Sequence, residues 1–378
     1  MLKFVVDDRI PYIKNALENY GDVVYLPGAT INASNLKNVD ALITRTRTKC
    51  NSSLLEGSQV RMIASATIGY DHIDTEWCEN NNIEWTNAPG CNAESVKQYI
   101  AAVLALLVTE KKWTLKGKSI AIVGVGNVGS KVSVLAKALG MKVYEVDPPR
   151  ARKEAGKRFY TLDEIAHKAD IFTFHTPLNK SGEDKTHHLC DALLLSKMKK
   201  EALVINSSRG EVVDGNALKC ALQNNALGGA VLDVWENEPT IDKNLLDLVW
   251  IGSPHIAGYS QDGKAKGTEM SVRAVSKYFG LGLENWQATG LPQPEMPNIV
   301  IDSQFKSDEN IIATAILHTY AIKNDDDGLR IDLSQFESLR GNYPVRREFQ
   351  AYEIIIKGGN ENVIHSLLAL GFKSVNTM

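Results

Sequence analysis

The segment that decides the fold is Ile120-Ala121-Ile122-Val123-Gly124-Val125-Gly126-Asn127-Val128-Gly129, in which an apolar run leads directly into three glycines. The apolar run at residues 119–123 predicts a buried β-strand, because a short stretch of this kind fits the interior of a sheet. Residues 130–140, after the last glycine, predict a helix. The spacing G-x-G-x-x-G is weak evidence alone, but a strand before it and a helix after it are the context that a dinucleotide-binding turn requires.

Each glycine of this segment has a physical task at a dinucleotide site. Gly124 permits the tight turn, Gly126 lets the backbone approach a pyrophosphate, and Gly129 lets helix and strand pack closely. The helix N-terminus favours the phosphate charge. The next predicted strand, 142–146, ends on Asp147, whose carboxylate would accept hydrogen bonds from ribose hydroxyls and repel a 2′-phosphate. NAD is therefore predicted rather than NADP; the alternative is that Asp147 is only a turn residue at the end of the strand.

Outward from this segment, short apolar runs alternate with helical patterns in two series. Before it, predicted strands lie at residues 4–6, 23–26, 41–44, 62–66 and 83–87, with helical patterns at 12–20 and 74–81. The second series of predicted strands is 119–123, 142–146, 171–175, 202–206, 229–234 and 250–253. Strands that alternate with helices imply parallel sheets. The predicted fold class is α/β, with two doubly wound parallel sheets: a flavodoxin-like substrate domain and a Rossmann NAD domain.

Two long helices would connect these sheets. One near residues 95–112 would carry the chain from the first sheet to the second, and one near 261–279 would bring it back. The substrate-binding domain is therefore expected to be discontinuous, formed by residues 1–94 and 261–289. The NAD-binding domain is expected to be continuous, at residues 95–260.

A proline-rich stretch marks the start of a third, smaller domain. Three prolines within residues 290–297 predict a stiff, extended connector. Beyond it, the pattern predicts strands at 298–301, 352–356 and 373–376 and helices at 310–321 and 362–370. Residues 290–378 should thus form a small α+β domain. The acidic run Asp325-Asp326-Asp327-Gly328 is expected to be an exposed turn.

Composition excludes several classes of function. The net charge of −3 provides no basic footprint for nucleic acid. The longest apolar stretch, residues 100–108, is too short to cross a bilayer, so no membrane association is expected. Five cysteines are scattered without C-x-x-C spacing, which favours reduced thiols and no metal site. Met1 leads straight into a predicted strand instead of a signal peptide, so the expected location is the cytoplasm.

Three segments at predicted strand ends carry residues suited to redox chemistry. They are residues 206–210, 233–239 and 253–258. Oxidising an alcohol to a ketone removes a hydride from carbon and a proton from oxygen, and histidine is the side chain best suited to accept that proton. A carboxylate beside it would stabilise its charged form, and an arginine would hold a substrate carboxylate. Taken singly, His255 could be an interior histidine and Arg209 a surface ion pair.

The order of these motifs resembles the D-2-hydroxyacid dehydrogenases over residues 1–285. The shared pattern is G-x-G-x-x-G, Asp, S-R-G, D-V-W-x-x-E-P and P-H-I-A-G. The resemblance implies that Arg209 holds the substrate carboxylate and carbonyl, that His255 is the acid/base and that Glu238 supports it. Glu236 is out of register with the family motif. His175 is a second choice for the catalytic base, because the family has a cofactor-contacting loop at its position.

The resemblance also implies which residues contact NAD, with Asp233, Gly258 and Thr176 on the nicotinamide side. The full set is Gly124, Gly126, Asn127, Val128, Gly129, Asp147, Thr176, Ser207, Ser208, Asp233 and Gly258.

A narrower resemblance concerns the substrate. Residues 67–74, 87–93, 146–150, 255–259 and 339–348 are similar to the branch of the family that oxidises 4-phospho-D-erythronate to 2-oxo-3-hydroxy-4-phosphobutanoate on the route to pyridoxal 5′-phosphate. This resemblance implies that the substrate is a small phosphorylated hydroxy acid. It marks three substrate-binding residues, which are Thr46, Thr67 and Tyr259. The cationic run Arg45-Thr46-Arg47-Thr48-Lys49 suits a phosphate, although it could equally be a solvated loop.

The same resemblance implies that residues 290–378 form a dimerisation domain and that the protein is a homodimer. Arg340, Arg346 and Arg347 are then expected either to pair with acids at the dimer interface or to approach the phosphate site of the partner. The interface role is the favoured one of the two.

Three other functions remain open from sequence alone. A related enzyme acting on 3-phosphoglycerate often carries a C-terminal regulatory domain, for which the last eighty residues could be mistaken. An unphosphorylated acid such as glycerate is a second alternative. A non-catalytic NAD sensor would have lost a catalytic residue, whereas Arg209, Glu238 and His255 are all present.

Overall fold

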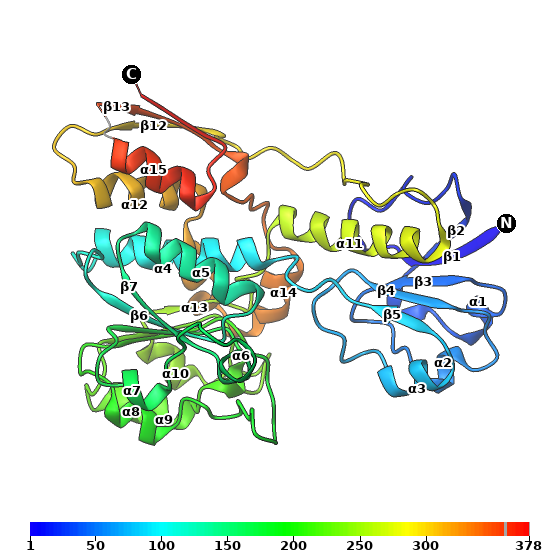
Figure 1. Cartoon of the computed structure of the whole chain (residues 1–378), viewed down its shortest axis with the longest axis horizontal. Coiled ribbons are helices and arrows are strands. Elements are labelled where there is room, and N and C mark those ends of the chain that lie inside the picture. Colours follow the sequence, from blue (N-terminus) through cyan, green and yellow to red (C-terminus); the bar gives the residue numbers. More distant parts are fainter. Residues whose placement is uncertain (359–360, 378) are drawn as a thin grey trace. The chain divides into compact units, whose positions relative to one another are not determined.

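The computed structural model describes residues 1–358 and 361–377. They divide into two compact units (Figure 1). The first unit comprises Met1–Asn92 and Ser260–Pro292, and the second comprises Ala93–Tyr259 together with the chain from Gln293 onward.

The first unit is a doubly wound sheet of five parallel strands. The strands are β1 (Leu2–Asp7), β2 (Gly21–Leu26), β3 (Ala41–Thr44), β4 (Met62–Ser65) and β5 (Glu84–Thr86). Its helices are α1 (Ala33–Leu36), α2 (Ser52–Leu55), α3 (Thr75–Asn80) and α11 (Gln261–Phe279). The strand order β2-β1-β3-β4-β5 is that of flavodoxin-like folds. Alternate residues of β1 bury their side chains on opposite faces, with Phe4 and Val6 facing α11 and Val5 facing α1 to α3.

The second unit contains a six-stranded parallel sheet. Its strands are β6 (Ser119–Val123), β7 (Lys142–Val146), β8 (Ile171–Phe174), β9 (Leu203–Asn206), β10 (Gly229–Leu232) and β11 (Ile251–Gly252). Their order, β11-β10-β9-β8-β6-β7, reverses direction at β6. Ligands of doubly wound folds bind beyond the carboxyl ends of the strands at such a switch point. The glycine segment follows β6 at this point, and the two sheets confirm the predicted α/β class.

The C-terminal segment adds further layers to the second unit. It contains β12 (Asn298–Asp302), β13 (Glu353–Lys357) and β14 (Ser374–Thr377), which form a parallel three-stranded sheet. The remaining helices of the unit are α4 (Ala93–Thr109), α5 (Asn127–Ala138), α6 (Pro148–Lys153), α7 (Leu162–Ile165), α8 (Ala192–Lys197), α9 (Gly215–Gln223), α10 (Lys243–Leu248), α12 (Asp308–Thr319), α13 (Ile322–Ile331), α14 (Phe336–Gly341) and α15 (Glu361–Leu370). Figure 1 shows α4 and α5 between the six-stranded sheet and the layer formed by α12 and α15.

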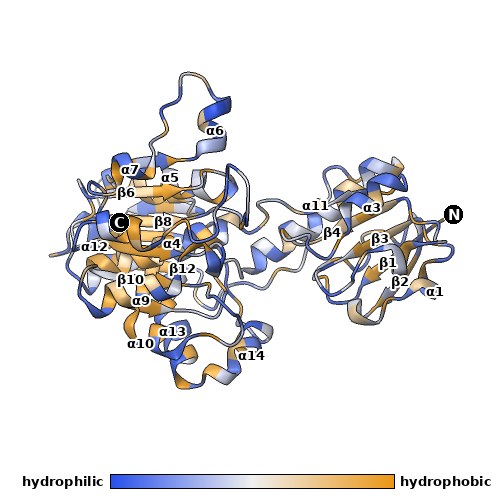
Figure 2. Cartoon of the chain, turned by 90° about the horizontal axis from the view of Figure 1, so that it is seen from below, coloured by the Kyte–Doolittle hydropathy of each residue, from blue (hydrophilic) through white to orange (hydrophobic). Residues whose placement is uncertain are grey.

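Helix α4 joins these layers into one hydrophobic core. Its side chains are apolar nearly all round, and residues 99–104 are fully buried, as expected of a helix covered on every face. The same core contains Ile122 of the large sheet, Ile316 of α12 and Ile356 of β13. Figure 2 shows the strands of this sheet and α4 as largely hydrophobic. No helix in the described part of the chain, α4 included, is long and apolar enough to cross a membrane.

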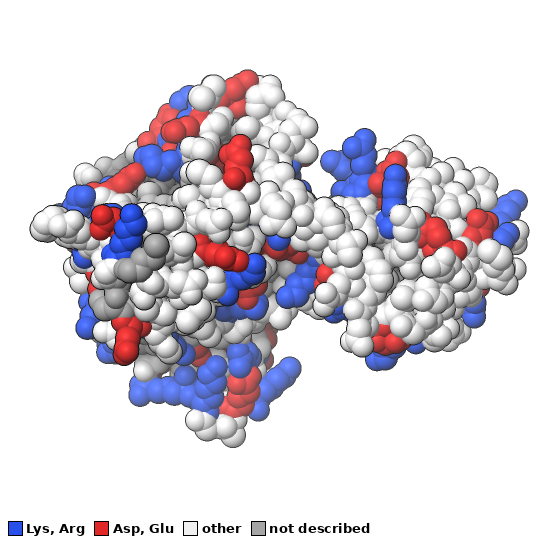
Figure 3. All heavy atoms as spheres, turned by 90° about the horizontal axis from the view of Figure 1, so that it is seen from above, with Lys and Arg blue, Asp and Glu red and all other residues white. Residues whose placement is uncertain are grey.

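The surface carries charges of both signs. Figure 3 shows lysines and arginines interspersed with aspartates and glutamates on the face drawn, without one large field of positive charge. This pattern agrees with the small net charge of −3 and with the absence of a basic footprint in the sequence.

The helix predicted at residues 12–20 is wrong. The segment forms successive turns, in which Ala16 N–H donates to Ile13 O and Tyr20 N–H to Leu17 O. Ile13 and Leu17 are buried at a spacing of four, which imitates an amphipathic helix. The positive φ of Asn15, 66°, interrupts any helix, and the Glu18 carboxylate accepts hydrogen bonds from the backbone of the turns instead.

The exposed turn predicted at residues 325–328 is also wrong. These residues belong to α13, where Asp326 is buried and accepts hydrogen bonds from Gly252 N–H at 2.7 Å and Arg330 Nε at 2.8 Å. Asp325 accepts hydrogen bonds from the hydroxyls of Tyr320 and Tyr343. Partners distant in sequence stabilise both carboxylates inside the protein, and local polarity could not reveal them.

Candidate active site

Strand register brings the predicted site residues to one edge of the large sheet. Val123 pairs with Val146 and Phe174, Asn206 with Phe174 and Leu232, and Leu232 with Gly252. The strands are parallel and these residues lie at their carboxyl ends. The loops that follow, which begin at Gly124, Asp147, His175, Ser207, Asp233 and Ser253, therefore all lie at the same edge.

The glycine turn has the tight geometry that its sequence predicts. Gly124 has a φ of 86°, and a Cβ there would lie 2.7 Å from His175 O. A Cβ on Gly129 would lie only 1.9 Å from Gly124 O, so packing of α5 against β6 requires this glycine. Gly126 differs: its φ is −77°, and a Cβ would meet no described atom within 4 Å. Nothing in the described chain demands glycine at 126, which leaves room for an external group at the start of α5.

Two buried hydroxyls at this edge also fit a ligand. Thr176 Oγ1 and Ser207 Oγ are buried and have no hydrogen-bond partner among the described residues. Buried hydroxyls without partners are unfavourable unless a bound molecule or water completes their hydrogen bonds. Both belong to the predicted cofactor contacts, so the residues present fit a dinucleotide along this edge.

The glycines provide a paired prediction. Gly126→Ala is expected to weaken NADH binding about tenfold or more without changing Tm, because the new methyl group enters only the space left for the pyrophosphate. Gly129→Ala is expected to lower Tm by several degrees, because its methyl group collides with the backbone of Gly124. Fluorescence titration with NADH and thermal unfolding would measure both. Equal losses of Tm in the two variants would contradict this assignment.

Asp147 lies at the end of β7 and holds the glycine turn in place. Its Oδ2 accepts a hydrogen bond from Val125 N–H at 2.8 Å, and its Oδ1 accepts one from Arg150 N–H at 3.0 Å, which caps α6. The Arg150 side chain in turn donates to Val125 O. Asp147 therefore has the structural role at the end of the strand that the sequence analysis left as an alternative. Its predicted contact with the ribose stays a prediction.

The loop after β9 presents Arg209. Asn206 shapes this loop, because its amide donates to Arg209 O at 2.8 Å while its Oδ1 accepts hydrogen bonds from Ser208 N–H and Oγ. Arg209 is exposed, and its Nη1 donates to Ser208 O at 2.7 Å. Gly210 brings this loop against the next one, because a Cβ there would lie 2.0 Å from Trp235 O.

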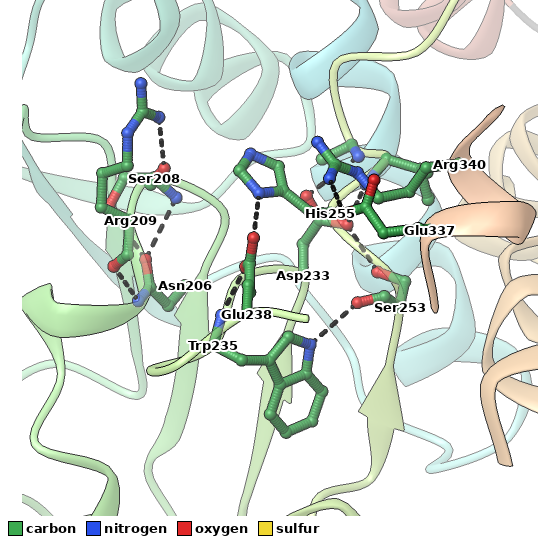
Figure 4. A network of polar contacts seen from close by, with 12 residues as sticks. Asn206, Ser208, Arg209, Asp233, Trp235, Glu238, Ser253, His255, Glu337 and Arg340 are labelled. Atoms are coloured by element: carbon green, nitrogen blue, oxygen red, sulfur yellow. Dashed lines mark hydrogen bonds and ion pairs between the residues drawn. The ribbon is translucent and has the colours of Figure 1, made fainter. Parts of the chain in front are cut away.

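His255 and Glu238 form a hydrogen-bonded pair (Figure 4). His255 Nδ1 lies 2.7 Å from Glu238 Oε2, while Glu238 Oε1 accepts a hydrogen bond from Trp235 N–H at 2.9 Å. The carboxylate thus fixes the imidazole orientation and favours a proton on Nδ1, which leaves Nε2 as the atom able to accept or donate a proton. Glu236, two residues earlier, instead lies 2.8 Å from His188 Nε2.

His175 is a poor candidate for the catalytic base. Burial lowers the pKa of His175 to about 3, so its imidazole is uncharged and weakly basic at neutral pH. Its Nε2 also lies 2.9 Å from Thr173 Oγ1, within its own strand end. Between the two histidines considered from sequence, the structure favours His255.

Asp233 supports the segment that carries His255. It is buried, and its carboxylate accepts hydrogen bonds from Ser253 Oγ, Ile256 N–H and Ala257 N–H at 2.7–2.9 Å. Burial raises the pKa of Asp233, although His255 and these hydrogen bonds act in the opposite direction. Asp233, which the sequence analysis placed on the nicotinamide side, therefore stabilises the turn after His255.

Arg340, which the sequence analysis assigned to a dimer interface or a partner's phosphate site, lies near Tyr259 of its own chain. Its guanidinium, on α14 of the same chain, lies 5.9 Å from the Tyr259 ring centroid, and Nη1 donates to Glu337 Oε1 at 2.8 Å. Its Nε is buried without a hydrogen-bond partner in the described chain. Burial acts to lower the pKa of Arg340, but the net shift is upward because of charges that include those of Glu337 and Glu238, which Figure 4 also draws. The expectation of an interface role is wrong for Arg346, whose side chain is buried inside its own chain.

The other predicted substrate residues belong to the first unit. Thr46 and Thr67 follow Thr44 and Ser65, which pair in neighbouring strands, so both lie beyond one edge of that sheet. Thr46 is exposed, whereas Thr67 Oγ1 donates to Gly69 O at 3.1 Å. Of the cations nearby, Arg45 pairs with buried Asp7 at 3.2 Å, while Arg47 and Lys49 are exposed.

Comparison with known proteins identifies relatives along the whole chain. The chain is 47% identical over 356 residues to an erythronate-4-phosphate dehydrogenase of Bacteroides fragilis, covering 94% of this chain and 99% of the relative. It is 39% identical over 376 residues to a protein of the same name from Photorhabdus laumondii, covering 99% of each.

Family models and solved structures agree with these relatives. The model described as D-isomer specific 2-hydroxyacid dehydrogenase, NAD binding domain, matches residues 105–257, and a domain of unknown function (DUF3410) matches 290–371. The structure of an Aquifex aeolicus D-lactate dehydrogenase complexed with NAD and lactic acid covers 75% of this chain and 97% of its own, with a TM-score of 0.59 and 26% identity. These findings confirm the predicted cofactor, NAD, and the predicted oxidoreductase class.

Proposed function

Because this chain belongs to the erythronate-4-phosphate dehydrogenase family of the D-isomer-specific 2-hydroxyacid dehydrogenases, we propose that it oxidises 4-phospho-D-erythronate to 2-oxo-3-hydroxy-4-phosphobutanoate. The reaction serves pyridoxal 5′-phosphate synthesis. The observation that carries the redox chemistry is the His255–Glu238 pair at the edge of an NAD-binding sheet that also presents Arg209.

The proposed mechanism uses three side chains. Arg209 binds the substrate carboxylate and polarises the C2 oxygen, because its planar guanidinium matches two oxygens at once. His255 Nε2 accepts the hydroxyl proton as the C2–H bond breaks, and the Glu238 carboxylate stabilises the imidazolium that forms. Bound NAD would supply the acceptor for the hydride that leaves C2. The cofactor contacts proposed are the eleven residues named from the resemblance, with the orphaned hydroxyls of Thr176 and Ser207 as support.

We further propose how the domains divide the work. Residues 1–94 and 261–289 bind the substrate through Thr46 and Thr67, residues 95–260 bind NAD, and residues 290–378 mediate homodimerisation. Val300, 57% exposed on β12, supports an interface on the small sheet. The five free cysteines support a reducing cytoplasmic location. Sedimentation of Val300→Lys, expected to be monomeric, would test the interface.

Arg340 supports a phosphorylated substrate, because Arg209 can neutralise only one of its two anionic groups. We expect Arg340→Met to raise KM for 4-phosphoerythronate about 10- to 100-fold, the loss expected for one charged hydrogen-bonded partner. KM for unphosphorylated erythronate should change little. The matched control is Glu337→Gln, which keeps the arginine and removes its ion pair. An equal rise in KM for both acids would show that Arg340 has no role at the phosphate.

The substrate itself is tested by comparing initial rates of NADH formation with 4-phosphoerythronate, 3-phosphoglycerate and glycerate. The proposal predicts the highest kcat/KM for 4-phosphoerythronate. A higher value for 3-phosphoglycerate would move the enzyme to another branch of the family. NADH binding without turnover of any of the three acids would favour a non-catalytic sensor.

A further inference from the structure

Arg346 is a buried cation of the C-terminal segment, far in sequence from the segments that carry the proposed catalytic residues. Only 5% of the residue is exposed. Its guanidinium carbon lies 4.4 Å from the ring centroid of Tyr320 and 5.6 Å from that of Tyr343. Both tyrosine hydroxyls donate to the half-buried Asp325, so a carboxylate lies beside the two rings. Burying a cation is costly, so its retention requires strong interactions.

The hydrogen bonds of Arg346 converge on the turn that carries His255. Its Nη2 donates to Ala257 O at 2.6 Å and to Ile256 O at 3.2 Å, and it also contacts Ser95 Oγ. Ser95 Oγ itself donates to Ala257 O at 3.0 Å. The carbonyl groups of the two residues after His255 are thus held by one guanidinium.

The amide groups of the same two residues are held from another direction. Ile256 N–H and Ala257 N–H both donate to Asp233, at 2.8 and 2.9 Å. An anion therefore binds the amides of this turn and a cation binds its carbonyls. His255 itself has a φ of 57°, in the left-handed region, so its backbone depends on the surrounding structure. Asp233 O also accepts from His255 N–H at 2.7 Å.

We propose that Arg346 is a positioning residue for catalysis: through the carbonyls of Ile256 and Ala257 it fixes the turn that aims the His255 imidazole at the substrate. The C-terminal segment is thereby part of the catalytic apparatus of its own chain, in addition to any role between chains. The inference rests on the proposed acid/base role of His255. It does not depend on which hydroxy acid is the substrate.

The charged and titratable groups around Arg346 come from several elements. Asp233 follows β10, Tyr320 follows α12, Asp325 lies on α13, Tyr343 follows α14, and Tyr99 lies on α4. Tyr99 OH lies 2.9 Å from Ser253 Oγ, which donates to Asp233, so one polar network reaches from α4 to the His255 turn. Substitution of Arg346 should therefore disturb the His255 turn, whereas the glycine turn and α5, which hold the pyrophosphate in the proposed site, lie outside the network described.

The test compares Arg346→Met and Arg346→Lys with Arg330→Met as a matched control. Arg330 is likewise in the C-terminal segment and donates to two backbone carbonyls, those of Leu246 and Val249, but these end helix α10 rather than the His255 turn. Arg346→Met is expected to lower kcat about 10- to 100-fold, the usual cost of misplacing a catalytic group by about 1 Å. Arg346→Lys should lose less, because the ammonium keeps the charge and can still donate to one of the two carbonyls. The Kd for NADH should change less than about twofold in each variant.

Two further readouts separate positioning from a merely structural role. The solvent deuterium isotope effect on kcat should rise in the Arg346 variants, because proton transfer to His255 becomes slower, and should not rise in Arg330→Met. The imidazole signals of His255 in long-range 1H–15N spectra, assigned with His255→Gln, should shift in the Arg346 variants alone. If Arg346→Met fails to fold, Arg346→Lys decides by the same measurements.

Failure of the positioning role of Arg346 and failure of the substrate assignment would give different experimental results. A wild-type enzyme inactive with 4-phosphoerythronate would overturn the substrate assignment, while the His255 signals still test the positioning role. Folded Arg346 variants with unchanged His255 signals would overturn the inference, as would a kcat loss that matches that of Arg330→Met.

Discussion

Replacing His255 with alanine is expected to lower kcat by roughly 10²- to 10⁴-fold, the usual contribution of a positioned general acid/base. The imidazole is the group that accepts the hydroxyl proton in the proposed mechanism. The Glu238 carboxylate, 2.7 Å from its Nδ1, stabilises the resulting imidazolium and cannot replace it when the imidazole is absent. NADH affinity should change less than about twofold, because the glycine turn and α5 are untouched. Pre-steady-state measurement of NADH formation, combined with an NADH titration, would separate the chemical step from binding.

His175→Ala is the informative comparison for this variant. His175 is a weak base because burial lowers its pKa to about 3, so its loss should not remove the group that accepts the hydroxyl proton. If His175→Ala abolishes turnover while His255→Ala retains it, the assignment of the base is reversed. Glu238→Gln should lie between wild type and His255→Ala, since it keeps the hydrogen-bonding shape and removes the charge.

The features that sequence predicted well depend on neighbours close along the chain. The strand at 119–123, the glycine turn and α5 follow one another in a single continuous segment, so the local sequence contains the information that specifies all three. The helix predicted at 261–279 matches α11 from Gln261 to Phe279, since Ser260 caps its start and Gly280 adopts the left-handed conformation at its end. Local pattern and local geometry agree in these cases.

The features that sequence missed depend on partners far along the chain. The sequence around Asp326 predicts a solvent-exposed turn. Asp326 is instead buried, and its carboxylate accepts a hydrogen bond from the N–H of Gly252, seventy-four positions away. Arg346 reads as an interface cation, yet its partners are the carbonyls of Ile256 and Ala257. Ile13 and Leu17 imitate a helix, although they are buried from a series of turns. No periodicity contains this information.

The layered core explains why the C-terminal segment reaches the active site. Its α12 and α15 share a hydrophobic core with α4, and α4 is the helix that begins with the residues around Ser95, a partner of Arg346. Once that core forms, Arg346 is fixed next to the turn that contains His255. The polar interactions are therefore consequences of apolar burial, which is the larger driving force for folding.

Replacing Arg209 is the second change with a large expected effect. Arg209→Met should lower kcat/KM by roughly 10³-fold or more, because the substrate loses both a bidentate carboxylate contact and the cation that stabilises the developing C2 oxygen charge. Arg209→Lys should restore part of this, mainly in KM, since an ammonium attracts the carboxylate but cannot match two oxygens in a plane. Stability should hardly change, because Arg209 is exposed and the one hydrogen bond described for its side chain is to the carbonyl of the neighbouring Ser208.

The decisive measurement for Arg209 is kcat/KM beside Tm and the Kd for NADH in the same preparation. A loss confined to kcat/KM would place Arg209 on the substrate, whereas a parallel loss of NADH affinity would place it on the cofactor. Asn206→Ala provides the control for loop shape, because Asn206 donates to Arg209 O and accepts from Ser208 without presenting a charge. If that variant lost as much activity as Arg209→Met, the shape of the loop and not the guanidinium would carry the effect.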